Sequence, residues 1–276
     1  MISIDYSGKI VLITGGGRGI GLGIAKAFAE AGATLIITYT STNPAATAQA
    51  IEKQYGVKVH VYYCPAEKSD LVDEMVEEVA AEVGEIDVVI ANAGVSLWRD
   101  AIDMTDAELL NIMQINLFAP MYLTRAVVRQ WLKVPVSLHS SSSDRGLRDQ
   151  KLHLGKKILF VSSISGIVAM TPQKQAAYNA SKAGLTMLAK SLAGEWAGYG
   201  ITVNAISPGY IQTDMIANPP PGEGEEWVKI WKSMTPVDRW GTAEDVANHI
   251  VLLCSDRAGS FMTGSDIVVD GGYTIF

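Results

Sequence analysis

"KIVLITGGGRGIG", residues 9–21, joins a short apolar run to a glycine-rich turn and the start of a helical pattern. An unbroken run of β-branched residues is typical of a strand buried on both faces of a parallel sheet. Gly15, Gly19 and Gly21 have no side chains, so a pyrophosphate can approach the backbone N–H groups at the helix N-terminus. A plain glycine turn is the alternative, but the flanking strand and helix favour a phosphate site that also includes Arg18 and Ile20.

The alternation of strand and helix continues along the whole chain. We expect strands at 9–14, 34–38, 87–91, 157–163, 201–207 and 266–270, and helices at 19–31, 44–55, 69–83, 106–132, 176–198 and 243–254. The chain has 276 residues, of which 48% are hydrophobic, enough for one sizeable core. These features predict an α/β fold with a doubly wound parallel sheet of the Rossmann type, in a single domain over residues 1–276.

Two segments interrupt this alternation. Residues 133–157 are polar and basic, so we expect an insertion loop exposed to solvent, with an intron read as coding sequence as the alternative. Residues 214–240 contain "ANPPPGEGEEW" and then a short amphipathic piece, which we interpret as a substrate lid. Trp98, Trp227 and Trp231 either clamp an apolar substrate there or serve only for packing.

Composition excludes several classes of function. The net charge of −7 argues against a nucleic-acid partner. The two cysteines, Cys64 and Cys254, lie far apart without metal-ligand spacing, so we expect no metal site and a reducing compartment, the cytoplasm. The start of the chain lacks the pattern of a signal peptide, and the apolar runs are too short to cross a membrane.

Two further turns follow strands and should lie beside the glycine-rich turn, because ligands of open α/β sheets bind at the carboxyl ends of the strands. The first is "ANAGV", 91–95, and the second is "SPGYIQT", 207–213. From these turns we expect cofactor contacts by Asn92, Ala93 and Gly94, and by Pro208, Gly209, Ile211 and Thr213. The sharp turn at Pro208 and Gly209 would bring Ile211 and Thr213 across a flat ring.

"AAYNASKAG", 176–184, places Tyr178 and Lys182 one helical turn apart on the same face. A solvated face of an amphipathic helix is the alternative. The glycine-rich turn, "NAG", the serine upstream of Y-x-x-x-K and the "PG" turn occur in the order of the classical short-chain dehydrogenase/reductase family, which nearly the whole chain resembles. The resemblance implies an NAD(P)-binding Rossmann-type fold and usually a homotetramer.

The same resemblance implies a catalytic tetrad. Its members are Asn116 in "INLFAP", Ser163 in "VSSISG", Tyr178 and Lys182, the last two also touching the cofactor. Ser165 is the alternative serine, because many members have a shorter spacing to the tyrosine. In the family's chemistry Tyr178 donates a proton, Lys182 lowers its pKa from about 10, Ser163 polarises the carbonyl, and Asn116 holds a water.

"TLIITYTSTN", 34–43, predicts the choice of cofactor. Enzymes of this fold that use NAD place a carboxylate at the end of the second strand, where it binds the ribose 2′-hydroxyl. Here Tyr39, Thr40 and Ser41 stand in that place, and Arg18 offers a positive charge, so we expect NADP(H). The acidic residue that the family usually has at the adenine is replaced by Pro65 in "YYCPAE", 62–67.

The subgroup is indicated by "AYNASKAG", "GEWAGYGITVNAISPGYI" and "MTGSDIVVDGGYT", which resemble fungal mannitol dehydrogenase, sorbose reductase and xylulose reductase enzymes. The resemblance implies NADP(H)-dependent, reversible reduction of a small ketone or ketose to a secondary alcohol or polyol. The alternatives are a 3-oxoacyl carrier-protein reductase or a broad carbonyl reductase. A dinucleotide-binding sensor is the non-enzymatic alternative, but a sensor has no need of the Tyr178–Lys182 pair.

Overall fold

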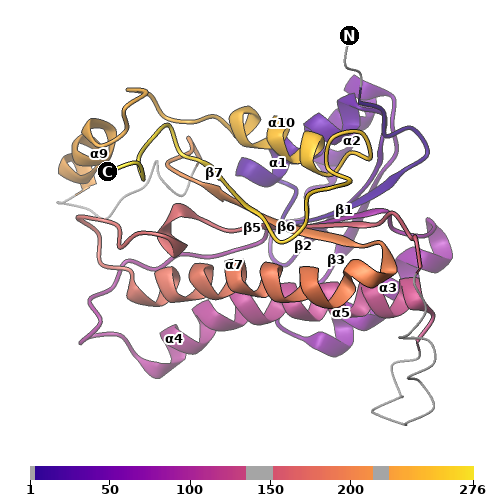
Figure 1. Cartoon of the computed structure of the whole chain (residues 1–276), viewed down its shortest axis with the longest axis horizontal. Coiled ribbons are helices and arrows are strands. Elements are labelled where there is room, and N and C mark those ends of the chain that lie inside the picture. The colour runs from indigo at the N-terminus through magenta and orange to yellow at the C-terminus, as the bar shows by residue number, and fades with distance from the viewer. Residues whose placement is uncertain (1–3, 135–151, 214–223) are drawn as a thin grey trace.

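The computed structural model describes residues 4–134, 152–213 and 224–276. Its centre is one parallel sheet with strand order β3-β2-β1-β4-β5-β6-β7 (Figure 1). The strands are β1 (Ile10–Thr14), β2 (Thr34–Tyr39), β3 (Val59–Tyr63), β4 (Val88–Ala91), β5 (Lys157–Val161), β6 (Thr202–Pro208) and β7 (Asp266–Val269). The predicted doubly wound α/β fold is confirmed. The strand order reverses between β1 and β4, which places the ligand crevice at their carboxyl ends.

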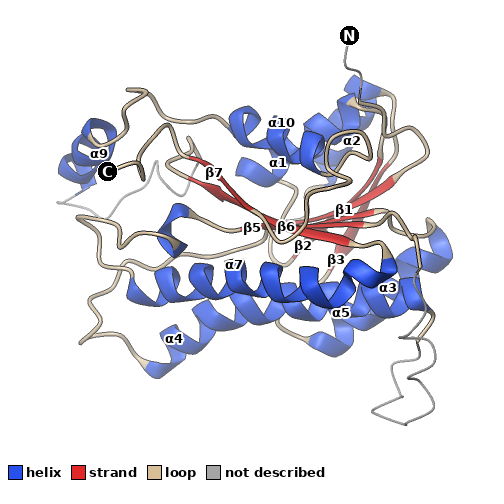
Figure 2. Ribbon diagram, viewed as in Figure 1, coloured by secondary structure: helices blue, strands red, loops and turns tan. Residues whose placement is uncertain are grey.

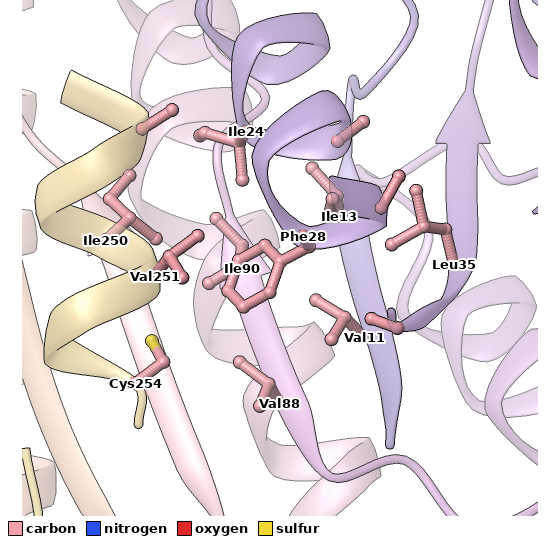
Figure 3. Packing of buried hydrophobic residues seen from close by; sticks show 14 of the residues in the cluster. Val11, Ile13, Ile24, Phe28, Leu35, Val88, Ile90, Ile250, Val251 and Cys254 are labelled. Atoms are coloured by element: carbon pink, nitrogen blue, oxygen red, sulfur yellow. The ribbon is translucent and has the colours of Figure 1, made fainter. Parts of the chain in front are cut away.

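Helices cover both faces of the sheet (Figure 2). One face carries α1 (Gly19–Glu30), α2 (Ala45–Tyr55) and α10 (Ala243–Leu253), and the other carries α3 (Ser69–Glu82), α5 (Ala119–Leu132) and α7 (Ala176–Trp196). Alternate residues of β1 supply the two cores, with Val11 and Ile13 in one and Leu12 in the other. Figure 3 shows Phe28 of α1 beside Val11 and Ile90. Burial on both faces is the reason that β1, β2, β4 and β5 are nearly unbroken apolar runs.

The expected helix at 106–132 contains an irregularity. It is formed by α4 (Asp106–Met113) and α5, with a π-helical turn, η1 (Gln114–Phe118), between them. Thr105 and Glu108 cap the start of α4 by exchanging hydrogen bonds in a capping box. Single π-helical turns often occur at functional sites, and this one carries Asn116.

The two interrupting segments are described only in part. Residues 135–151 of the insertion and 214–223 of the lid lie outside the described residues. The end of the insertion is not a solvated loop as expected, because Leu152 and Leu154 donate backbone hydrogen bonds to Gly198 and Tyr199. Lys156 is buried, with ion pairs to Glu85 (2.7 Å) and Asp87 (3.0 Å). Residues 152–156 are therefore part of the packed domain.

The lid region resumes with α9 (Gly224–Ser233), and two short 3-10 turns, η3 (Ile164–Gly166) and η4 (Ala197–Tyr199), flank α7. In the described ranges no helix has both the length and the apolar character to cross a membrane. Those ranges also contain no cluster of histidine, cysteine and acidic side chains suited to a metal ion.

Candidate active site

The glycine-rich turn forms a cradle at the N-terminus of α1. Gly15 and Gly19 have positive φ angles of 65° and 53°, which residues with side chains rarely adopt. A Cβ on Gly21 would lie 2.3 Å from the Gly15 carbonyl oxygen, so only glycine fits there. Arg18 is the N-cap residue, but its side chain forms no capping hydrogen bond, and the first turn contains no acidic residue. The unpaired N–H groups of that turn therefore fit an anion such as a pyrophosphate.

Asn92 and Ala93 brace this cradle from the end of β4. The Asn92 side-chain amide donates to the Thr14 carbonyl (2.9 Å), and the backbone N–H groups of Asn92 and Ala93 both donate to the Thr14 hydroxyl. Gly15 donates its N–H to the Thr38 carbonyl of β2 (3.0 Å). Three strand ends are thus locked together, so Asn92 uses its side chain to position the loop.

The end of β2 is rich in hydroxyl groups and free of carboxylates. Thr40 and Ser41 are exposed, and Tyr39 accepts a hydrogen bond from the Asn43 side-chain amide (3.1 Å). The Asn43 side-chain oxygen accepts from the Ala45 N–H at the start of α2 (3.0 Å). Asn43 was not among the predicted site residues, although an asparagine followed by proline before a helix was a visible turn signal.

The turn after β6 lies against the cradle. Pro208 ends the strand, and a Cβ on Gly209 would lie 2.8 Å from the Asp270 Cα atom, so a larger residue does not fit. The Thr213 side chain lies 3.4 Å from the position that a Cβ on Gly19 would take. The Ile211 side chain, in contrast, is buried in the core with 3% exposed. Of this pair, Thr213 is thus the side chain beside the cradle.

Ser163 and Tyr178 meet at the end of β5. Tyr178 shares a side-chain hydrogen bond with Ser163, whose hydroxyl also accepts from the Ser165 N–H (3.1 Å). The Ser165 hydroxyl instead accepts from the Gln175 side chain (3.0 Å) and is buried beneath it. Ser163, the second residue after β5, is therefore the serine that the fold presents to Tyr178.

Lys182 lies one helical turn after Tyr178 on α7. Its ammonium donates to the Val161 carbonyl (2.9 Å) and lies 5.8 Å from the centroid of the Tyr178 ring. Burial lowers the pKa of Lys182 to about 8. Gly94 lies beside this group, since a Cβ there would be 3.4 Å from Lys182 Nζ and 3.3 Å from the Asn116 side-chain oxygen. The "NAG" turn is thus in direct contact with Lys182 and Asn116.

The pKa of Tyr178 does not follow the expectation from sequence. Burial raises the pKa of the phenol, and the hydrogen bond with Ser163 opposes this effect only in part. The ammonium of Lys182 lies 5.8 Å from the centroid of the Tyr178 ring, and burial disfavours its positive charge. Within the chain alone, desolvation of the phenol therefore outweighs its attraction to Lys182.

The Asn116 side chain forms three hydrogen bonds to other residues of the protein. The side-chain oxygen accepts from the Val95 N–H (2.9 Å), and the amide donates to the Val95 carbonyl (2.9 Å) and to the Ser181 hydroxyl (3.1 Å). Both amide hydrogens are used, so at most one lone pair of the side-chain oxygen remains for a water. The side chain of Asn116 thus holds the turn after β4 against α7.

The part of the crevice where the sequence led us to expect the adenine is apolar. A cavity of about 20 Å³ lies there, and its lining, which includes Cys64, Ala66, Met75 and Ala93, contains no charged residue. Burial raises the pKa of the Cys64 thiol to about 11, so it stays neutral. Pro65 is buried beside it. A cavity of this size holds about one water molecule, and its lining offers no carboxylate to an adenine.

Aromatic side chains gather at the opposite end. Trp98, after β4, contacts Trp227 of α9 edge to face, with 5.8 Å between the ring centroids. Trp231 is fully buried, whereas Trp98 and Trp227 are half-buried. Of the three tryptophans considered from sequence, Trp231 is therefore inaccessible to a substrate.

The similarity of this chain to known proteins covers nearly its whole length. The profile of the family described as enoyl-(acyl carrier protein) reductase matches residues 15–274. An NADP-dependent mannitol dehydrogenase of Hypocrea jecorina is 38% identical over 274 residues, which cover 97% of this chain and 92% of that protein. A sorbose reductase of Candida albicans is 37% identical over 270 residues, covering 97% of this chain and 87% of that one.

Solved structures of dehydrogenases and reductases also resemble this chain over nearly its whole length. A short-chain type dehydrogenase/reductase from Mycobacterium marinum has a TM-score of 0.84 at 33% identity, with 98% of this chain and 97% of that one covered. An L-sorbose reductase from Gluconobacter frateurii, solved with NADPH and L-sorbose, has a TM-score of 0.83 at 26% identity, with both chains fully covered. With its cradle, its Ser163–Tyr178–Lys182 group and these full-length matches, the chain belongs to the short-chain dehydrogenase/reductase family and is an oxidoreductase.

Proposed function

We propose that this oxidoreductase uses NADP(H) to reduce a small ketose reversibly to the corresponding polyol. The observation that carries this proposal is the position of Ser163, Tyr178 and Lys182 beside the cradle of α1. The names of the relatives, mannitol dehydrogenase and sorbose reductase, support the substrate class. The cofactor fits, because the cradle admits a pyrophosphate and no carboxylate at residues 39–43 repels a 2′-phosphate.

A nicotinamide cofactor held at the cradle would supply the hydride for reduction and accept it in the reverse reaction. Tyr178 donates its hydroxyl proton to the carbonyl oxygen and recovers a proton when the alcohol is oxidised. Ser163 donates a hydrogen bond to the same oxygen and polarises the carbonyl. Lys182 stabilises the phenolate with its positive charge, which it retains for the most part at neutral pH because its pKa is about 8.

A single observation favours a second substrate class. Trp98 and Trp227 form a half-buried aromatic pair at the end of the crevice, and such a surface suits an acyl chain better than a polyol. A 3-oxoacyl carrier-protein reductase or a broad carbonyl reductase is therefore the alternative activity.

We further propose a homotetramer in the cytoplasm. Two faces expose large apolar side chains, one with Leu110 of α4 and Met187 of α7, and the other with Val268 of the edge strand β7. Two self-complementary faces generate a closed tetramer. The free thiols of Cys64 and Cys254 suit a reducing compartment. Light scattering during gel filtration measures the mass, and a monomer would overturn the assembly.

The activity is tested by following the loss of NADPH absorbance with a panel of ketoses, simple ketones and acetoacetyl thioesters. We expect the highest kcat/KM with a ketose, and the matching polyol should reduce NADP⁺ in the reverse assay. Highest kcat/KM with a thioester would favour the alternative. No turnover of any of these carbonyl compounds would overturn the proposal.

A further inference from the structure

Gln173 lies at the meeting point of three segments that surround the site. It belongs to the loop between η3 and α7 that leads to Tyr178, and only 4% of it is exposed. Its side-chain oxygen accepts a hydrogen bond from the indole N–H of Trp231 (2.8 Å). Its side-chain amide donates to the hydroxyl of Tyr210 (2.9 Å). One buried side-chain amide thus links the loop between η3 and α7 to α9 and to the turn after β6.

The two partners of Gln173 also contact each other. The rings of Tyr210 and Trp231 are stacked, with centroids 4.7 Å apart and planes inclined by 18°. Tyr210 directly follows the turn of Pro208 and Gly209, beside the cradle. The stack and the two hydrogen bonds form a closed triangle, so none of the three side chains can move without disturbing the other two.

Helix α9 depends on this triangle for its position. It stands apart from the two helical layers (Figure 1), and only Gly224 and Trp231 of the helix are buried. Trp231 is fully buried and is among the largest such side chains in the described chain. An indole N–H or an amide without a partner is costly in such surroundings, so α9 is stable where both hydrogen bonds of Gln173 can form.

The register of Trp231 also sets the place of Trp227, one helical turn earlier. Trp227 meets Trp98 edge to face, and Trp98 belongs to the segment after β4 that continues from "NAG". Because Trp231 faces inward, the half-buried Trp98–Trp227 pair forms the accessible aromatic wall of the site. A displacement of α9 would move this wall but would leave Tyr178 and Lys182 on α7 in place.

We propose that Gln173 is a positioning residue for substrate binding: it fixes α9 and thereby the Trp98–Trp227 wall. This inference rests on the proposed function, because it concerns the substrate of that same site. Gln173 acts on KM and on the choice of substrate, whereas proton transfer by Tyr178 and binding of NADPH do not depend on it.

The test compares Gln173→Leu with Gln173→Glu, Trp231→Phe and the double variant Gln173→Leu/Trp231→Phe. Glutamate retains the oxygen that accepts from the indole and replaces the amide donor by a second oxygen, which can accept from the Tyr210 hydroxyl. Phenylalanine at position 231 retains an aromatic ring but loses the N–H donor. The matched control is Gln130→Leu on α5, next to Trp131, whose indole donates to the Ile86 carbonyl just before β4, at the amino end of that central strand and away from the site at the carboxyl ends. The side-chain oxygen of Gln130 has no hydrogen-bond partner in the described chain.

For Gln173→Leu we expect KM for the ketose to rise about tenfold, with kcat and the dissociation constant of NADPH changed less than about twofold. Gln173→Glu should restore most of the lost affinity. Trp231→Phe should resemble Gln173→Leu, and the double variant should be little worse than either, because both remove the same hydrogen bond. A loss of thermal stability with unchanged KM would assign Gln173 a purely structural role and overturn the proposal.

A second readout keeps this inference separate from the proposed function. Acrylamide quenching of tryptophan fluorescence should increase in Gln173→Leu and stay at the wild-type level in Gln130→Leu, whether or not a substrate is known. If the wild-type protein turns over no carbonyl compound, the proposed function fails, and quenching alone decides whether Gln173 holds α9. Unchanged quenching in Gln173→Leu would overturn the role of Gln173.

Discussion

Gly21→Ala tests the cradle at the point where it is tightest. The new Cβ would lie 2.3 Å from the Gly15 carbonyl oxygen and 2.6 Å from the Asn92 amide nitrogen. The backbone at Gly15 cannot simply move aside, because its N–H is bonded to Thr38 and the Asn92 amide is bonded to Thr14. Forcing a methyl group into such a site costs about 1–3 kcal/mol of stability. The displaced atoms form the phosphate cradle, so NADPH affinity should fall about tenfold or more.

Two other glycines provide matched controls for this substitution. A Cβ on Gly23, in the same helix, would lie 2.6 Å from the Cβ of Ala243, at the contact between α1 and α10. Gly23→Ala should therefore lower stability while NADPH affinity changes little. Gly194 lies inside α7, and a Cβ there meets nothing within 4 Å. Gly194→Ala should raise stability by about 0.5–1 kcal/mol, because alanine loses less backbone entropy in a helix.

Thermal unfolding and a fluorescence titration with NADPH measure both effects for the three variants. Wild-type affinity in a folded Gly21→Ala protein would refute the assignment of this loop as the pyrophosphate site. Equal loss of affinity in Gly21→Ala and Gly23→Ala would show that the effect follows from general destabilisation of α1.

Three further predictions concern the catalytic and cofactor residues. Tyr178→Phe should lower kcat about 100-fold or more while NADPH binding is kept, since only the proton donor is lost; retention of more than about a tenth of the rate would contradict this role. Tyr39→Asp should shift the ratio of kcat/KM values toward NADH by about tenfold or more, and a wild-type preference for NADH would refute the assignment. Lys182→Met should change the pH dependence of stability. The pKa of Lys182 is about 8 in the fold and 10.5 ordinarily, so the wild type gains stability as pH rises through that window. The free energy of unfolding of the wild type should rise by about 3 kcal/mol across this window, and that of the variant should not. If the free energies of unfolding of the two proteins change in parallel between pH 8 and pH 10, the prediction is wrong.

The sheet and the cradle were predictable because local sequence decides both. The run predicted at 34–38 forms β2 (Thr34–Tyr39), since a strand covered on both faces is apolar at nearly every buried position, here Leu35, Ile36 and Ile37. Gly21 was identifiable because glycine is needed where backbone atoms come within 2.3 Å of a Cβ position. In both cases the constraint acts on residues near each other in the sequence.

Other features depend on partners far along the chain. The π-helical turn at Gln114–Phe118 has the same apolar period as its flanking helices, so sequence predicted one helix across 106–132. Residues 152–156 look like a polar loop until Gly198 and Tyr199 provide their hydrogen-bond partners. The hydrogen bond of Gln173 to Trp231 joins residues 58 positions apart, and neither residue belongs to a recognisable motif.

The residues that local sequence positions and the residues that depend on distant partners serve different functions in the proposed site. The proposed proton donor and its neighbours lie at the end of β5 and on α7, the longest helix in the described ranges, and their positions follow from the sheet. The aromatic wall comes from α9 and from the segment after β4, and α9 is anchored mainly by Trp231. Substitutions around Gln173 can therefore move the substrate surface without disturbing the Ser163–Tyr178 hydrogen bond. If Gln173 holds α9 as we propose, proton transfer and substrate choice depend on separate parts of this fold.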